Sequence, residues 1–180
     1  TEIGLEIQAP QFVSNGVFRK SGQIQTDDLY LKQTLLTTIP QTYGDFGYSV
    51  AVNGNTMMIG APLYWNTAGT TFICSRANSN WSSSWTCPTT SSGNNGDEFG
   101  YSVAFDGTTL VVGAPGTNFG GNGGQGVVYL FEYNGTGWQN IAGFSNPVAD
   151  NAAGNFFGSS VDVSGNYMIV GAPGYGSGDE

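Results

Sequence analysis

The chain has 180 residues, of which 29 are glycine and only 9% are charged. Its 13 acidic and 4 basic residues give a net charge of −9 at pH 7, and it contains no histidine. Four basic residues are too few to form a basic patch, and we therefore expect no nucleic-acid partner. No apolar run reaches the length of a membrane span, so we expect no membrane insertion. A polar but weakly charged surface favours a secreted or extracellular protein.

Residues 1–29 are predicted to form an N-terminal strand-forming arm. Three apolar residues alternate with polar or small ones, which is the pattern of a strand with one apolar face, and two more apolar residues follow. We expect residues 1 to about 20 of this arm to pack on a neighbouring copy near residues 171–180; the alternative is that the arm belongs to a preceding unit lost by truncation. The chain begins at Thr1 without a leader, so we expect it to be processed or a fragment. The predicted assembly residues are Ile3, Leu5, Ile7, Phe12 and Val13.

A repeated phrase organises residues 30–180, which we assign to a repeat array. The phrase occurs without insertion at residues 46–62, 99–115 and 157–173. Repetition of this kind predicts stacked units, none of which buries its apolar face alone. Each copy opens with Phe-Gly and closes with Gly-Ala-Pro. The residues of the repeat motif are Phe46, Gly47, Gly60, Ala61, Pro62, Phe99, Gly100, Gly113, Ala114, Pro115, Phe157, Gly158, Gly171, Ala172 and Pro173.

Each copy of the phrase is predicted to form a tight antiparallel inner hairpin, over Tyr48–Ile59, Tyr101–Val112 and Ser160–Val170. A stretch of period-two alternation is followed by Asn-Gly, Asp-Gly or Ser-Gly and then by an apolar run. Asn-Gly and Asp-Gly indicate a type I′ turn, in which both central residues have positive φ. The apolar second strand should lie in the middle of a sheet, and the proline after it should end it.

A second, outer hairpin is predicted between the phrases. Residues 127–133 form one strand, 134–137 the turn, and Trp138 begins the return. In the preceding copy, 70–74 lead out, 77–80 turn and 81–87 return. Four strands in each unit are the content of one propeller blade. The predicted fold is therefore all-β, with β-propeller-type blades of four-stranded antiparallel sheets and three repeats in an incomplete or open propeller. A full propeller needs at least four blades, so the chain is a piece of a longer propeller or extends through another chain.

The outer hairpins also carry the chemistry of a secreted protein. Cys74 and Cys87 fall on the two strands of one hairpin, which favours a disulfide in an oxidising compartment; two free thiols are the alternative. The sequons at Asn80 and Asn134 fall in the same turn of successive units, so we expect N-linked glycans on both. The Ser- and Thr-rich stretch 86–92 is a candidate for O-linked sugars.

Two tryptophans recur at matching places in these hairpins. Trp81 and Trp138 each begin the predicted returning strand. We expect them to be packing anchors between units; the alternative is an exposed platform for stacking sugars.

The three phrases resemble the FG-GAP repeats that build the β-propeller of integrin α subunits and of many bacterial and protist surface proteins. The resemblance covers residues 30–173, with Phe-Gly, Ser-Val and Gly-Ala-Pro in register. It implies blade-like four-stranded sheets, an extracellular location, and roles in adhesion or protein interaction rather than catalysis.

The chain departs from this family at the loop that often binds calcium. Many FG-GAP repeats place several carboxylates between the two inner strands, as a Ca²⁺ site requires. Here the turns contain at most one carboxylate, so we expect no calcium in the inner turns and no cofactor. The residues Asp45, Asp97 and Glu98 precede two of the Phe-Gly pairs; they either gather a cation at a blade edge or form turns.

Catalytic chemistry is largely excluded by composition. Without histidine, the usual general base and the commonest zinc ligand are missing. The adjacent carboxylate pairs Asp27-Asp28 and Asp97-Glu98 fall on turns where we expect them to be solvated. The glycine-rich stretch 120–124 lacks the lysine and helix of a phosphate-binding loop. We expect no catalytic residue and no enzyme; a carbohydrate-active enzyme is the weakest hypothesis.

The function that fits best is an extracellular structural or adhesive repeat protein. We expect it to self-associate head to tail into a filament or larger assembly, through its N-terminal strands and an open last blade. The alternative is a fragment of a secreted or cell-surface propeller that serves as an adhesion module. The expected partners are other copies of the chain, N-linked glycans, and a protein or glycan ligand.

Overall fold

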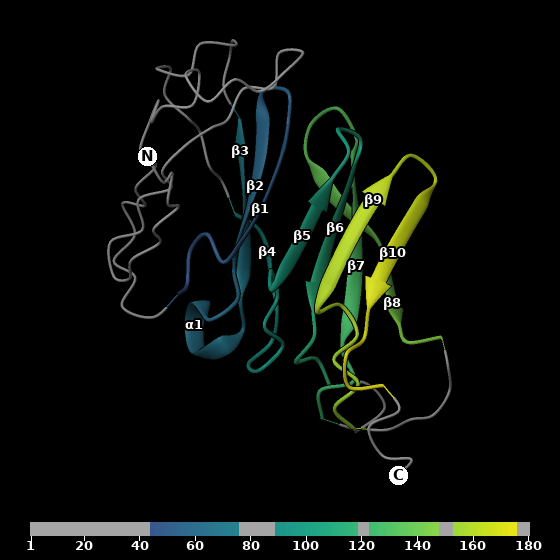
Figure 1. The fold of residues 1–180 in the computed structure, drawn as a ribbon. Helices are drawn as coiled ribbons and strands as arrows, with labels where there is room; N and C mark the ends of the chain where they lie inside the picture. Colours follow the sequence, from purple (N-terminus) through teal and green to yellow (C-terminus); the bar gives the residue numbers. More distant parts are fainter. Residues whose placement is uncertain (1–43, 76–88, 119–122, 148–152, 176–180) are drawn as a thin grey trace, which may run out of the picture.

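The fold was analysed in a computed structural model, which describes residues 44–75, 89–118, 123–147 and 153–175 (Figure 1). These residues form ten strands and one four-residue helix, so the prediction of an all-β fold is confirmed for the described part of the chain. The strands make antiparallel sheets of two to four strands, none of which closes on itself. No helix in the described part of the chain is long and apolar enough to cross a membrane.

The first sheet, which we call the first unit, has four antiparallel strands in chain order. Its two inner strands come from the first phrase. A short helix, α1 (Tyr64–Thr67), connects β2 to β3 directly after Pro62. The strands are β1 (Ser49–Asn53), β2 (Thr56–Ala61), β3 (Thr70–Ser75) and β4 (Thr89–Ser92).

The second and third units follow the same plan, and the three sheets stand side by side in Figure 1. The second unit has four strands and the third has two among the described residues. The inner hairpin of the second unit contacts the inner hairpins of both neighbours. The strands are β5 (Ser102–Phe105), β6 (Thr109–Ala114), β7 (Val127–Tyr133) and β8 (Trp138–Ser145), then β9 (Ser160–Ser164) and β10 (Tyr167–Gly171).

The apolar second strand of each phrase was predicted to lie centrally, and β6 does so. It pairs with β5 on one side and with β7 on the other. Leu110, Val111 and Val112 are fully buried because both faces of β6 are covered. β2 is central in the same way, between β1 and β3.

The inner turns differ from the predicted type I′ geometry. Asn53 pairs with Thr56, so Gly54 and Asn55 are the two central residues. Only the glycine has positive φ (57°), as in a type II′ turn, which requires glycine at its first central position. Gly165 repeats this arrangement in the third unit, with φ of 56°.

The outer hairpin of the first unit also differs in part from the prediction. The described strand that pairs with β3 is β4, residues 89–92, and a register shift interrupts the pairing. The predicted return over residues 81–87 lies outside the described residues. In the second unit, β7 and β8 pair around the 134–137 turn as predicted.

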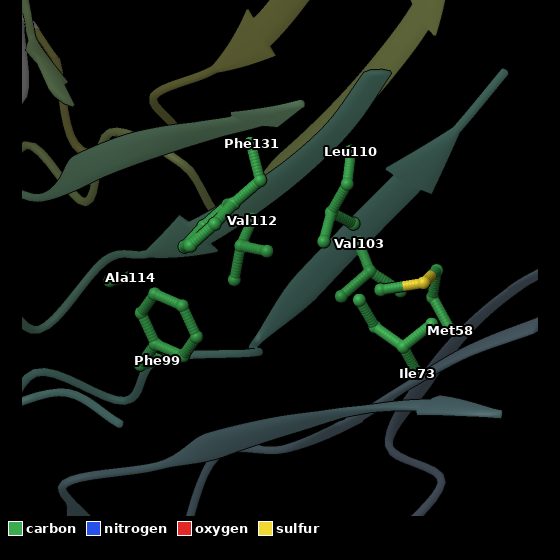
Figure 2. Close-up of a cluster of buried hydrophobic side chains, with 8 residues drawn as sticks. All are labelled: Met58, Ile73, Phe99, Val103, Leu110, Val112, Ala114 and Phe131. Atoms are coloured by element: carbon green, nitrogen blue, oxygen red, sulfur yellow. The ribbon is translucent and has the colours of Figure 1, made fainter. Parts of the chain in front are cut away.

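Of the three hydrophobic clusters that the described residues form in the core, two join neighbouring units, and the third lies within the first unit. One cluster joins Met58 and Ile73 of the first unit to Val103 and Leu110 of the second (Figure 2). Another joins Ala104 and Val111 of the second unit to Phe157 and the valines of the third. Burying an aliphatic or aromatic side chain contributes about 1.5–3 kcal/mol, so the contacts between units add to the stability of each.

Candidate functional site

The same hydrogen bond joins each unit to the next one. Ser49 Oγ in the first unit donates to the carbonyl oxygen of Gly100 in the second, at 2.8 Å. Ser102 Oγ in the second unit donates to the carbonyl oxygen of Gly158 in the third, at 2.7 Å. The serine at the fourth position of each phrase therefore holds the Phe-Gly backbone of the following unit.

The glycine of Gly-Ala-Pro makes this approach possible. A methyl group built on Gly60 would overlap the carbonyl oxygen of Gly100, and one built on Gly113 would overlap that of Gly158. Only glycine lets two backbones come this close. The phrase thus has glycine where one unit meets the backbone of the next, beside the serine that donates the bond.

The Phe-Gly pair fixes the entry into each unit. Its glycine N–H donates to the glycine carbonyl of Gly-Ala-Pro in the same unit, as from Gly100 to Gly113 at 3.0 Å. Its phenylalanine is buried in all three units. The residue before each pair adopts positive φ although it is not glycine. These residues are Asp45 (48°), Glu98 (57°) and Phe156 (53°).

The inner turns form a second line of contacts between units. Asn53 Nδ2 donates to the Asp106 carbonyl at 2.6 Å, and the Gly165 N–H donates to Asp106 Oδ2 at 3.1 Å. Asp106 Oδ1 accepts from the N–H groups of Thr108 and Thr109. These backbone donors hold the pKa of the Asp106 carboxyl below its usual value.

A tyrosine pair also joins the first two units. The rings of Tyr48 and Tyr101 lie 4.9 Å apart, centroid to centroid. A hydrogen bond with the Tyr101 hydroxyl raises the pKa of Tyr48 to about 12. The third unit has Ser159 at this position, and its hydroxyl donates to the carbonyl of Phe156 at 2.7 Å.

The acidic residues before Phe-Gly act as turn residues. Asp97 was expected to be solvated, but it is buried, and its Oδ2 accepts from the Asn94 N–H at 2.7 Å. That prediction was wrong because the turn folds back onto its own carboxylate. Partial burial raises the pKa of Glu98. Across the described residues no three acidic or sulfur ligands gather in a metal-binding group.

The third unit presents a face that the first two units bury. Ile169 occupies the position of Met58 and Val111 in the repeat. Those two side chains are fully buried, whereas Ile169 is 70% exposed, and its neighbour Tyr167 is 81% exposed.

The turn at Asn134 is exposed and well ordered by its own side chain. Asn134 Oδ1 accepts from the N–H and hydroxyl of Thr136 and from the Gly137 N–H. Trp138 beside it lies 5.5 Å from the ring of Phe105 and 5.6 Å from that of Tyr133. It packs against the cluster shared by the first two units, as a packing anchor would.

Several predicted residues fall outside the described residues. Cys74 is buried in β3, but its predicted partner is not described. The described ladder places Phe72 opposite Thr89, and each of these residues lies two positions from a cysteine. The residues that cannot be placed are Cys87, Asn80, Trp81, Asp27, Asp28, Ile3, Leu5, Ile7, Phe12 and Val13.

The serine and turn contacts were missed from the sequence. Ser49, Ser102 and Ser160 stand at the same place in all three phrases, and that recurrence was the available signal. Asn53 and Asp106 were treated only as turn formers, because nothing in one hairpin reveals that its turn touches the next.

Comparison with known families finds one match. The family described as FG-GAP repeat matches residues 89–131 and 148–180. These segments contain the second and third phrases. The first phrase lies outside them, yet its serine and glycine make the same contacts as those of the second. No curated protein matches the chain.

Proposed function

The chain is an FG-GAP repeat protein, and from this premise we propose that it is an extracellular adhesive or structural protein that self-associates head to tail. FG-GAP repeats suggest a β-propeller module for adhesion or ligand binding, and they occur in extracellular and cell-surface proteins. We further propose how the units stack and what covers the first and last of them.

The observation that carries the proposal is the repeated contact between units. Ser49 binds the Gly100 carbonyl in the same way as Ser102 binds the Gly158 carbonyl, so the two junctions between units have the same contact. A contact that every unit can make with its neighbour does not limit the number of units. We propose that the units are propeller-type blades and that another copy of the chain continues the stack.

The edge of the third sheet supports this proposal. β2 and β6 each have two neighbours, whereas β10 pairs only with β9 among the described residues. A strand edge that no described residue covers can pair with a strand from another chain. We propose that residues 1 to about 20, through Ile3, Leu5, Ile7, Phe12 and Val13, add at this edge.

Three further features fit secretion. We propose a Cys74–Cys87 disulfide, and glycans on Asn80 and Asn134. The exposed amide at Asn134 supports the last of these, because its oxygen is held by the turn and its nitrogen makes no hydrogen bond with a described residue.

Light scattering on the full chain across a range of concentrations tests the proposal. A mass that rises with concentration, with elongated or ring-shaped particles in electron micrographs, is expected. Deleting residues 1–20 should weaken this assembly and leave the β-sheet circular dichroism unchanged. A chain that stays monomeric at every concentration contradicts self-association and leaves a monomeric adhesion module.

A further inference from the structure

We propose that two faces of the described units bind each other between copies of the chain, and that Asp162 weakens this contact. The leading face is formed by Val50, Val52 and the Gly47 carbonyl on the first unit. The trailing face is formed by Ser160, Asp162, Ile169 and Gly171 on the third. This inference rests on the proposed self-association and specifies its surfaces.

The chain already forms this interface twice within itself. Val103, which corresponds to Val50, packs against Met58 and Ile73 of the preceding unit (Figure 2). Val161 and Val163, which correspond to Val50 and Val52, belong to the cluster that contains Ala104 and Val111. In both cases the first strand of one unit lies on the inner hairpin of the unit before it.

The leading face has the apolar residues of this interface, and no other described unit covers them. Val50 is 65% exposed and Val52 is 59% exposed, whereas Val103 is only 8% exposed. Both side chains lie on the side of β1 opposite Ser49 and Ala51, which face the second unit. No described side chain donates a hydrogen bond to the Gly47 carbonyl.

The trailing face has the matching half. The Ser160 hydroxyl makes no hydrogen bond with any described residue, whereas its counterparts in the first two units hold a glycine carbonyl. A methyl group on Gly171 would meet only Ser160, so the space filled by a carbonyl at Gly60 and Gly113 is open there. We therefore place the Gly47 carbonyl of a second copy at Ser160, and its Val50 and Val52 over Ile169.

Asp162 is the one residue that opposes this contact. Its counterparts are Ala51 and Ala104, which pack in the interunit clusters. Asp162 is exposed, and its Oδ1 accepts only the N–H of Val163, at 2.9 Å. Covering a carboxylate with two valines costs free energy unless a donor pairs with it, so the contact between copies is weaker than the contacts within one chain.

The faces differ, so the contact is head to tail, and a mixing experiment tests this polarity. Ile169→Asp removes the trailing face, and Val50→Asp removes the leading face of the full-length chain. Each variant alone should lose association at least about a hundredfold, because the added carboxylate would be buried without a donor and close to Asp162, which pairs with position 169 across the hairpin. An equimolar mixture should form a dimer, because each variant keeps the face that the other lacks.

A matched control shows whether the loss of association is specific to the two faces. Ile141→Asp changes an equally large, 49% exposed isoleucine on β8, away from both faces, and should assemble like wild type. Circular dichroism melts verify that each variant folds. If Ile169→Asp does not fold, Tyr167→Asp at the neighbouring exposed position replaces it.

A gain of association tests the role of Asp162. Asp162→Ala should strengthen assembly by about tenfold or more. Glu132→Ala removes the same charge from an exposed position on β7 and should have a much smaller effect. Since each copy carries a net charge of −9, added salt should strengthen the wild-type contact by screening repulsion.

Each outcome has one meaning. Assembly that survives both the Ile169→Asp and the Val50→Asp change, a mixture that stays monomeric, or an Asp162→Ala variant no stronger than Glu132→Ala overturns this inference. If wild type still assembles in those cases, the proposed self-association stands through another contact. If wild type is monomeric at every concentration and salt level, both proposals are wrong.

Discussion

Ser102 Oγ donates a 2.7 Å hydrogen bond to the carbonyl oxygen of Gly158, 56 residues further along the chain. The contact is buried and joins two sheets through a side chain and a backbone atom. It shows that the repeated phrase encodes both a hairpin and the means of attaching the next hairpin.

Gly113→Ala should destabilise the protein by about 1–3 kcal/mol, because the new methyl group would overlap the Gly158 carbonyl and force the units apart. Gly137→Ala is the matched control. It has nothing within 4 Å of the added carbon, and its effect should stay within about 0.5 kcal/mol. Urea denaturation measures both, and equal losses would contradict the role assigned to Gly113.

Ser102→Ala should cost about 0.5–1.5 kcal/mol, the net value of one hydrogen bond, and more if the Gly158 carbonyl stays buried without a donor. Ser164→Ala, at an exposed turn, is the control. Urea denaturation of both variants gives the difference in the free energy of unfolding. A Ser102 variant as stable as the Ser164 variant would show that the bond contributes nothing.

Asp106→Asn should reduce stability at neutral pH and should matter less in acid. The folded pKa of Asp106 is lowered by the backbone N–H groups of Thr108 and Thr109. The carboxylate therefore contributes stability above the unfolded pKa of about 3.9, and this is lost as pH falls through the folded value. Melting temperatures from neutral pH to acid should converge for wild type and variant. A constant difference would exclude the charge as the cause.

Tyr101→Phe should lower the pKa of Tyr48 from about 12 toward its ordinary value of 10.0, because the hydrogen bond with the Tyr101 hydroxyl is the main cause of the shift. A raised folded pKa means that wild-type stability falls as pH rises between these two values, and the variant should lose this dependence. Tyrosinate absorbance during an alkaline titration measures it. Tyr133→Phe removes a tyrosine elsewhere and should leave the Tyr48 titration unchanged.

Alkylation without reductant should label neither cysteine, since we predict a Cys74–Cys87 disulfide. Reduction should then lower stability by about 2–3 kcal/mol, because the closed loop is short. Mass spectrometry of alkylated chains with and without reductant makes the measurement. Two labelled thiols in the unreduced chain would disprove the bridge.

Expression in a eukaryotic secretory host should add an N-linked glycan at Asn134. The turn is exposed and fixed by hydrogen bonds to the side-chain oxygen, which leaves the nitrogen available. Asn134→Gln should lose the mass of one glycan, and Asn140→Gln, an exposed asparagine outside any sequon, should lose none. An unchanged glycan mass in Asn134→Gln would refute the site.

The sequence predicted the parts of the fold that depend on neighbours along the chain. Alternation and the Gly-containing break placed β1 and β2, and the apolar run placed β6 in the middle of its sheet. These signals are local, so no knowledge of the other units was needed.

Contacts between units were harder to predict, because their partners lie more than 50 residues apart. The bond from Asn53 to Asp106 depends on how two hairpins stack, and neither hairpin encodes it alone. Asp97 was misread for a related reason: whether a turn carboxylate meets water or Asn94 depends on how the turn closes. The predicted type I′ turn was wrong because the two-residue loop is shifted by one position. An Asn-Gly sequence also permits a loop whose first residue is the glycine.

The joint at Gly60 and Gly113 has an evolutionary consequence. Each unit binds its neighbour through a backbone carbonyl oxygen, an atom that every amino acid has. Side chains elsewhere on the facing strands can therefore diverge while the joint keeps its geometry. A gene encoding such units can gain or lose whole copies by duplication or deletion, and the serine–carbonyl contact can form again at each new junction.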